Sequence, residues 1–460
     1  MHSYLKLRRR YYVLALSLGL YLLLRSPRQD IANLTIVDTR RIDHILDSKL
    51  SGILHDLRTE NGQYLVDESV QHNIQAKQDA LHCFVSRGTW ATNTQDSDSR
   101  PTFHPEWTCL NTSASSENIS APPPDTALPH HIARSLCTSL STRKVLLVGP
   151  EATHHLHTLW LDAIDEDHTC LGPEFCTFHH ICLPPHMRNA TSRAEPRFKK
   201  LPGDQDLVSL GSALLRFSLS SALFVAADPR AYSEVRVDRA TGVRARDSNW
   251  FELARRSHVV VLHRGPLPAP APTYNVSDEP GALDRWELSW ADVLRHGGDS
   301  RTDYYTGPDG RLSRVDGLVN AALDATLDTV LPEIIETLLL VRKDDVVSKN
   351  ALMWHGAWYK QPRCASQNRV SDANVFDSSL DPWSLYHNLQ VYMQNRLLPV
   401  ILPLFEVPFV PMVVPTAVGD FLSVPQSHLR SDCVRYPLDS PGGEALQRSF
   451  MTSLDYLVHS

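Results

Sequence analysis

The chain has 460 residues, a formal net charge of -7 at pH 7 and 42% hydrophobic residues. This length allows one large domain with appendages or two domains, and the hydrophobic fraction is sufficient for a sizeable core. The acidic balance gives no electrostatic footprint for nucleic acid, so we expect no nucleic-acid partner. With 31 prolines against 20 glycines, the connections are expected to be stiff rather than flexible.

The N-terminus predicts a membrane segment. Residues 1–10 hold a basic cluster and form the expected cytoplasmic tail, whereas residues 11–24 carry no charge. As a helix the uncharged run spans roughly 21 Å, short of a hydrocarbon core, but flanking arginine and tyrosine side chains extend it. The basic cluster places the rest of the chain in the lumen. A cleaved signal peptide and an uncleaved anchor both fit; the lack of a small-x-small site soon after Leu24 favours the anchor.

Other features agree with a lumenal address. N-glycosylation sequons begin at Asn33, Asn111, Asn118, Asn189 and Asn275. The even number of cysteines, 8, predicts disulfides in an oxidising compartment, although their pairing cannot be deduced from the sequence. Cys170, Cys176 and Cys182 lie close enough in sequence to staple local loops.

Residues 25–80 are expected to form a stem that contains an amphipathic helix. Apolar residues recur at helical spacing from Ile42 to Leu57. Such a stripe either packs on the following domain or forms a short dimeric coiled coil. The repeat is too short to favour the coiled coil, so packing is the preferred interpretation. Residues 81–460 are then the lumenal domain, which begins with a segment of loop character between Cys83 and Cys109.

The core of that domain is predicted to start at Lys144. Val145 to Val148 are all apolar, which is typical of a strand buried on both faces, and Gly149 with Pro150 marks a tight turn. Helical periodicity follows. Sites in parallel sheets gather at the carboxyl ends of strands, so Glu151 falls where chemistry is expected, at the positive end of the helix dipole.

The remaining elements follow in order. We expect a helix and then a strand within 207–225, a strand over 258–262, a long helix over 319–341 that is interrupted at Pro332, a strand followed by a loop over 350–358, a helix over 384–397, a short strand over 398–404 and a closing helix over 442–457. Alternating strands and helices predict a mostly parallel sheet flanked by helices, in an α/β domain.

Four segments in order resemble a known family. Cys83-Phe-Val-Ser-Arg-Gly-Thr-Trp with Cys109 is similar to the opening of the trichome-birefringence-like domain, and Gly149-Pro150-Glu151 stands where that family and its PC-esterase relatives carry Gly-Asp-Ser. Leu262-His263-Arg264-Gly265 resembles their Leu-Asn-Arg-Gly segment. Asp432-Cys433-Val434-Arg435 resembles their Asp-Cys-x-His segment. The resemblance covers residues 81–460 and implies an SGNH-hydrolase-like fold and acyl-ester chemistry on glycans, often polysaccharide O-acetylation in the Golgi.

The departures from the family pattern concern the catalytic groups. The family uses a serine nucleophile, a histidine base and an aspartate that orients the histidine, with backbone N–H groups and an asparagine at the oxyanion. By the resemblance, the serine position is Glu151, the asparagine position is His263 and the histidine position is Arg435. Gly149 and Asp432 are retained. Arginine stays protonated and cannot act as a general base.

Three interpretations remain open. The domain keeps the fold and a glycan groove without catalysis; or Glu151 acts as nucleophile or base with help from Asp432, Arg435 or His263; or the nucleophile lies elsewhere. An ion pair between Glu151 and Arg435 fits the second interpretation, but it fits a structural salt bridge equally well, and arginine makes the carboxylate a poorer base.

Further clusters have residue types that occur in binding sites. His154 and His157 share a helical face near His155, His179 and His180, but with 22 histidines in the chain such groups arise easily, so we expect no metal and no cofactor. Trp354 and Trp358 either stack on a sugar or pack at the core, and Arg264 either meets an anionic sugar or is an ordinary arginine. Taken together, the sequence predicts a single-pass, glycosylated membrane protein, expected in the Golgi. Its expected partners are a polysaccharide or glycan and, as a further option, a glycan-modifying enzyme for which it is a scaffold.

Overall fold

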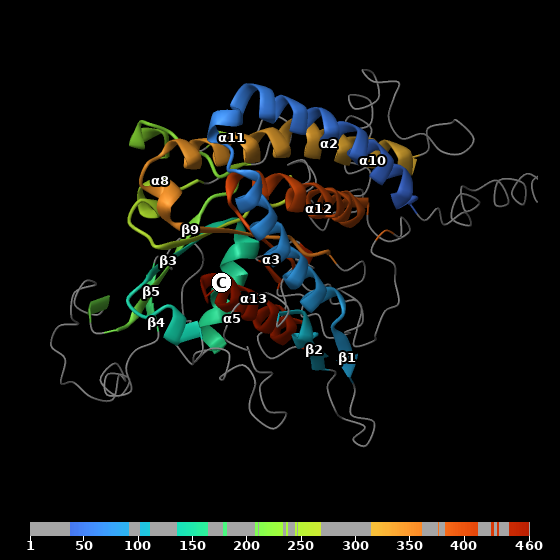
Figure 1. Ribbon diagram of the computed structural model, residues 1–460. Coiled ribbons are helices and arrows are strands. Elements are labelled where there is room, and N and C mark those ends of the chain that lie inside the picture. Colours follow the sequence, from blue (N-terminus) through green and yellow to red (C-terminus); the bar gives the residue numbers. More distant parts are fainter. Residues whose placement is uncertain are drawn as a thin grey trace, which may run out of the picture.

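The structure is a computed structural model of the chain (Figure 1). It describes residues 37–91, 102–110, 136–163, 178–181, 208–209, 211–232, 236–237, 244–245, 247–267, 314–360, 376, 382–412, 425–426, 430–431 and 441–459. The segment 11–24 and all the sequon asparagines lie outside these residues. Among the described residues, no helix combines the length and apolar character needed to cross a bilayer.

A mostly parallel sheet forms the centre of the domain, as the alternating pattern predicted. Its strands follow the order β10-β9-β8-β3-β5-β4. All neighbours are parallel except β4, which runs antiparallel to β5 at one edge. The strands are β3 (Lys144–Gly149), β4 (Phe178–Ile181), β5 (Ala213–Leu219), β8 (Val259–Leu262), β9 (Ala351–His355) and β10 (Phe409–Val410).

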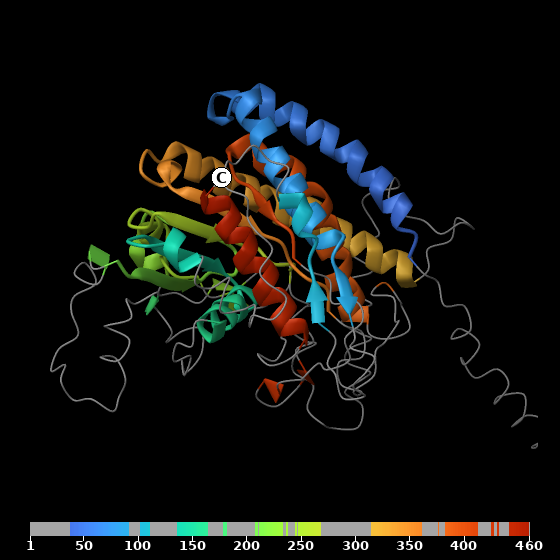
Figure 2. The same ribbon diagram turned by 60° about the horizontal axis from the view of Figure 1, so that its bottom comes forward.

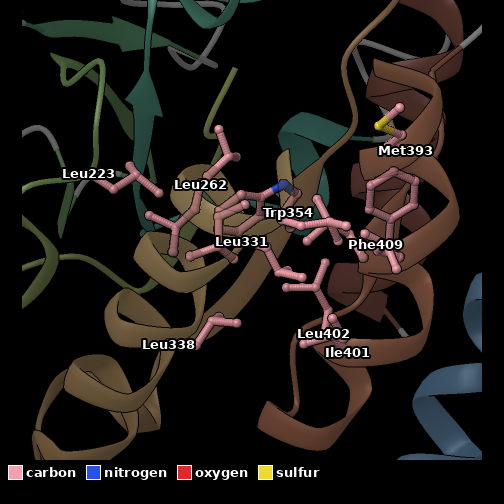
Figure 3. Packing of buried hydrophobic residues seen from close by; sticks show 14 of the residues in the cluster. Leu223, Leu262, Leu331, Leu338, Trp354, Met393, Ile401, Leu402 and Phe409 are labelled. Carbon is pink, nitrogen blue, oxygen red and sulfur yellow. The ribbon is translucent and has the colours of Figure 1, made fainter. Parts of the chain in front are cut away.

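Helices cover both faces of the sheet (Figures 1 and 2). Leu146, Val148 and Trp354 point to one face, where helices α2, α8, α10, α11 and α12 bury them, as Figure 3 shows for Trp354. Val145 and Leu147 point to the other face, against α5 and α13. Because successive residues of a strand alternate between faces, a strand covered on both sides must be apolar throughout. The uninterrupted apolar runs of β3 and β8 have this cause.

The helices that cover the sheet include predicted ones, whereas α3 and α8 were not predicted. The helices are α2 (Thr39–Asn61), α3 (Glu68–Ser86), α5 (Glu151–Ala163), α8 (Trp250–Ala254), α10 (Arg314–Asp324), α11 (Leu331–Lys343), α12 (Pro382–Ile401) and α13 (Pro441–His459). The long helix expected over 319–341 is present. Between α10 and α11 the helix continues through a π-helical turn, Ala325–Val330, with right-handed helical backbone at Val330 and Leu331. The expected interruption at Pro332 is therefore not observed.

The connectivity of the sheet defines its switch point. From β3 the chain crosses to the edge strand β4, continues into β5 beside β3, and then returns to β8 on the other side of β3. In doubly wound sheets of this order, ligands bind at the carboxyl ends of the strands where the direction of winding reverses. This point lies between the ends of β3 and β8, next to the end of β9.

The residues expected to form a stem are part of the domain. Ile42, Leu46 and Leu57 of α2 are buried in the same core as α12. The hydroxyl of Tyr392 on α12 donates to Asp43 of α2 at 2.7 Å. The apolar stripe of α2 therefore packs on the domain within this chain, which was the preferred interpretation. The expected domain boundary at residue 81 is corrected, because the packed domain already includes α2 and α3.

Two local predictions are also corrected. Residues 398–404 are not a strand but the end of α12 followed by the 3-10 helix Leu402–Phe405, because Pro399 and Pro403 remove donors that a sheet would need. Residues 83–109 are not a plain loop. They contain the end of α3, the antiparallel pair β1 (Thr89–Ala91) and β2 (Thr102–His104), and the 3-10 helix η3 (Trp107–Leu110).

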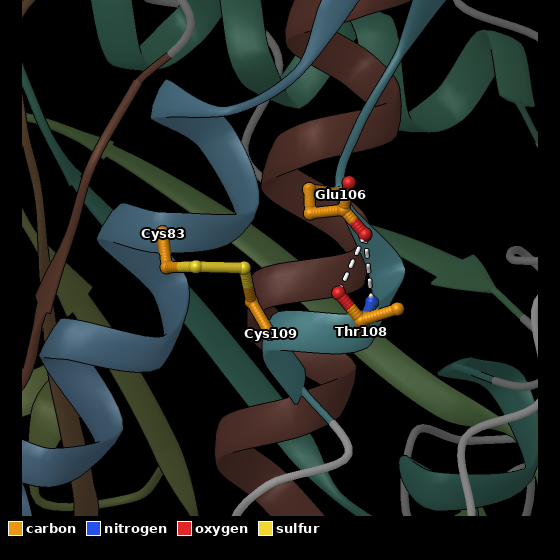
Figure 4. Close-up of a disulfide and its surroundings, with 4 residues drawn as sticks. All are labelled: Cys83, Glu106, Thr108 and Cys109. Carbon is orange, nitrogen blue, oxygen red and sulfur yellow. Dashed lines mark hydrogen bonds between the residues drawn. A yellow bond between two sulfur atoms is a disulfide. The ribbon is translucent and has the colours of Figure 1, made fainter.

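A disulfide joins this segment to α3. Cys83 and Cys109 are bonded, with a Cα–Cα distance of 5.8 Å (Figure 4). Next to it the Glu106 carboxylate accepts hydrogen bonds from the backbone N–H and the hydroxyl of Thr108, which lower the pKa of Glu106. Cys137 is disulfide-bonded as well. The closely spaced Cys170, Cys176 and Cys182 lie outside the described residues.

Candidate functional site at the carboxyl edge of the sheet

Three segments meet at the switch point, and we call them together the switch-point edge: Gly149–Thr153 after β3, His263–Gly265 after β8, and His355–Gly356 at the end of β9. The sequence-predicted residues Gly149 and His263 come together here, because a Cβ added to Gly149 would lie 3.0 Å from the carbonyl oxygen of His263. The same Cβ would lie 2.1 Å from Oγ1 of Thr153. Glycine is therefore required at 149 by the close approach of two neighbouring segments.

Glu151 begins α5, at the carboxyl end of β3 as expected, and it is exposed. Its carboxylate lies at the end of the helix where the macrodipole favours a negative charge. Asp432 and Arg435, the other two residues assigned from the resemblance, lie outside the described residues. The distance between Glu151 and Arg435 therefore remains a prediction.

His263 is buried, with 1% of its surface exposed. Its Nδ1–H donates to the carbonyl oxygen of His355 at 2.8 Å, and the two imidazole rings stack with centroids 4.0 Å apart. The opposite nitrogen, Nε2, is buried and has no hydrogen-bond partner. The His263 side chain therefore connects the ends of two strands. It does not face solvent, as a side chain that contacts a substrate would.

His355 continues the same cluster. Its Nδ1–H donates to the carbonyl oxygen of Gly356 at 2.9 Å, so its Nε2 is left as the acceptor for the hydroxyl of Thr153, also at 2.9 Å. Burial lowers the pKa of His355 to about 4, and burial with the neighbouring His355 lowers the pKa of His263 well below its usual value. Both rings are therefore neutral at pH 7.

Three residues assigned to substrate binding are placed in the interior, which corrects that expectation. Trp354 is 0% and Trp358 is 2% exposed, so neither indole presents a face to a sugar. Trp354 lies in β9 on the face covered by α11 and α12, and the aromatic-rich sequence reflects packing. The guanidinium of Arg264 donates to Glu333 at 2.8 Å and to the carbonyl oxygen of Ser221 at 2.7 Å, so it is committed to protein acceptors.

The histidines of α5 are accounted for by packing. The rings of His154 and His157 lie with their centroids 5.2 and 6.0 Å from that of Phe217 in β5. Within the part of the chain that the structure describes, no three His, Cys, Asp or Glu side chains are grouped so that they could hold a metal ion. The side chains of His179 and His180 are not among those described.

Sequence reasoning missed Thr153 and His355 at the switch-point edge. The position of Thr153 could have been recognised from the sequence, because it lies in the first turn of the helix that follows the turn at Gly149. His355 sits at the end of a predicted strand, next to Trp354, and only sugar stacking and core packing are considered for this aromatic-rich segment. Its partners come from β8 and α5, and no local pattern reveals such contacts.

Sequence reasoning also missed a second polar cluster, which lies between α13 and the segment before the start of β3. Ser139 hydrogen-bonds to both Asp455 and His459 of α13. These residue types occur in catalytic triads, but there the aspartate orients the histidine through Nδ1. Here Oδ1 of Asp455 and Nε2 of His459 both converge on the serine hydroxyl, 3.5 Å from each other. The arrangement ties the last turn of α13 to the segment before β3.

The chain was compared with known proteins at the level of families, sequences and structures. No family model, no curated protein and no solved structure matches it.

Proposed function

We propose that this chain is a non-catalytic relative of the PC-esterase and trichome-birefringence-like proteins. In this proposal an N-terminal anchor holds it in the secretory pathway, in the Golgi, with the α/β domain in the lumen. The domain has an SGNH-hydrolase-like arrangement and acts by binding, either to a glycan or to an enzyme that modifies glycans. The doubly wound order of the sheet supports the fold part of this proposal.

One observation carries the non-catalytic part. At the position where the resemblance expects a side chain at the oxyanion, the ring of His263 is buried and its Nδ1–H is committed to the carbonyl of His355. An oxyanion donor must instead point to the place where the substrate oxygen develops charge. Among the described residues of the switch-point edge, the hydroxyl beside a histidine is that of Thr153, which donates to Nε2 of His355. Thr153 is 0% exposed, so its hydroxyl does not face a substrate.

The alternative function is an active acyl-ester hydrolase or O-acetyltransferase that uses Glu151. The exposure of Glu151 at the start of α5 favours it, because a substrate could reach this carboxylate. The two functions differ in a simple measurement. The full chain in detergent is assayed for release of acetate from acetylated polysaccharide and from a small acetyl ester, beside Glu151→Ala and, as a matched control, Glu60→Ala on the exposed side of α2.

The non-catalytic proposal expects the same background release from all three proteins. Turnover above background that Glu151→Ala abolishes and Glu60→Ala preserves would overturn it in favour of the enzyme. Binding is tested with the same proteins on immobilised plain and acetylated polysaccharides, and by co-purification of glycan-modifying enzymes. We expect Glu151→Ala to weaken one of these interactions, since Glu151 is the exposed charged side chain of the switch-point edge. Absence of both interactions in the unmodified chain would contradict a binding role.

A further inference from the structure

Three side chains connect the segments of the switch-point edge, and we call them the histidine clamp: Thr153, His263 and His355. Thr153 belongs to the first turn of α5, His263 follows β8 and His355 ends β9. Each is at most 1% exposed. The hydrogen bonds from Thr153 to His355 and from His263 to the carbonyl of His355 therefore join a helix N-terminus to two strand ends.

The clamp works only while both rings are neutral. A proton on Nε2 of His355 would turn this acceptor into a donor and displace the hydroxyl hydrogen of Thr153 from it. A proton on Nε2 of His263 would create a buried N–H beside Pro150 and Gly265. The three groups are close neighbours, because a Cβ built on Gly265 would lie 3.3 Å from Cγ of Pro150 and 3.7 Å from Nε2 of His263. The proline ring offers this N–H no acceptor. A buried charge without an acceptor is costly.

The charged surroundings add to this cost. Arg264, next in sequence, carries a positive charge that disfavours protonation of His263, although it is itself paired with Glu333 of α11. His387 of α12 acts on His263 in the same direction. From α13 the ring of Phe450 faces His355, with the two centroids 6.2 Å apart, and it carries no charge. Glu151, on α5, is exposed to solvent.

We propose that the histidine clamp is an acid-sensitive lock, which holds the first turn of α5 against β8 and β9 at neutral pH and releases it when the compartment acidifies. The inference adds regulation to the switch-point edge. It rests on the proposed function for what the release controls, namely the position of Glu151, the first residue of α5, relative to a bound glycan or partner enzyme. The release itself is a property of the free chain and can be measured without any ligand.

The direction of the pH dependence follows from the two states. In the closed state both imidazoles resist protonation, whereas an imidazole exposed by opening titrates near its ordinary pKa of about 6.5. The pKa is therefore lower in the closed state, and closure is lost as the pH falls below about 6.5, down to the pKa of about 4 for His355. The ratio of open to closed chain then rises by up to about tenfold per pH unit for each imidazole.

Hydrogen exchange of the full chain tests this proposal. Exchange is followed by mass spectrometry at about pH 7 and about pH 5, with rates corrected for the chemical pH dependence. Residues 144–160, 259–267 and 351–358 report on the clamp, and α11 is the internal reference. We expect protection at the clamp to fall at least about tenfold more than protection of α11. An equal change in α11 would indicate general acid unfolding and would overturn the proposal.

Variants assign the effect to the two rings. The double variant His263→Gln with His355→Gln is expected to lose the pH response, and His72→Gln, at an exposed position of α3, is expected to keep it. An unchanged pH response in the double variant would contradict the lock. Thr153→Val covers the case in which the double variant does not fold. It keeps the side-chain shape but removes the hydroxyl, so exchange in the first turn of α5 should rise at pH 7, and an unaltered rate there would also overturn the proposal. Failure of glycan or enzyme binding would leave all these rates as they are.

Discussion

The guanidinium of Arg264 donates two hydrogen bonds to one carboxylate oxygen of Glu333, from Nε at 3.1 Å and from Nη2 at 2.8 Å. Its third nitrogen donates to the carbonyl oxygen of Ser221 at 2.7 Å. The Arg264 side chain is 5% exposed and that of Glu333 is 37% exposed. This pair joins the end of β8 to the first turn of α11, so the arginine that looked suited to an anionic ligand is a structural residue.

Arg264→Met should therefore destabilise the domain. The change removes the partner of Glu333 and leaves the Ser221 carbonyl without its donor, which we expect to lower the free energy of unfolding by about 2 kcal/mol. Arg255→Met is the matched control, because Arg255 pairs with Asp344 and its side chain is 43% exposed, so solvent screens the pair and the loss should be much smaller. Urea unfolding followed by tryptophan fluorescence compares the two. Equal decreases in the free energy of unfolding would show that the buried Arg264–Glu333 pair stabilises the domain no more than the exposed Arg255–Asp344 pair.

Gly149→Ala should disturb the switch-point edge directly. The added Cβ would lie 2.1 Å from Oγ1 of Thr153, so the first turn of α5 must shift, at an expected loss of about 1–3 kcal/mol. Gly52→Ala in α2 is the opposite case, since nothing lies within 4 Å of its Cβ. At this helical position alanine should stabilise by up to about 1 kcal/mol. Thermal unfolding measures both, and a stabilising effect of Gly149→Ala would rule out the close approach.

Leu46→Ala tests whether α2 belongs to the domain. Leu46 is 0% exposed in the core shared with α12, so its truncation should reduce the free energy of unfolding by about 2–4 kcal/mol. Lys49→Ala, on the exposed side of the same helix, should change it by less than about 0.5 kcal/mol. The coiled-coil alternative makes a different prediction: sedimentation would then show that Leu46→Ala dissociates a dimer without lowering the stability of the domain.

The double variant Cys83→Ser with Cys109→Ser should lose the constraint between α3 and η3. The bridge closes a loop with a sequence separation of 26, and removing a bridge of this span costs about 3 kcal/mol. The contact of Phe84 with Trp107, with ring centroids 5.2 Å apart, keeps the two segments together in the folded state. We thus expect a lower midpoint of unfolding with unchanged circular dichroism. A spectrum that changes would mean that the bridge is needed for the fold itself.

The central strands could be predicted because their covering helices leave a local signature. Residues 145–148 and 259–262 are apolar at every position, since both faces of these strands are buried. Helix α13 was found for a related reason: apolar residues that contact the core recur at helical spacing, from Leu446 through Phe450 to Leu454. In each case the pattern lies within one segment and can be read without knowledge of the neighbours.

The environment of the candidate site was decided by the tertiary structure alone. Periodicity tells which side of an element is apolar, but not which distant segment covers it. Trp354 and Arg264 thus had the right chemistry for a ligand and are buried by α11, which follows Arg264 by a long stretch of sequence. The role of His263 likewise depends on the carbonyl of His355, 92 residues away. Side-chain exposure and hydrogen-bond partners are properties of the packed chain, whereas the period of an apolar run is a property of the sequence itself.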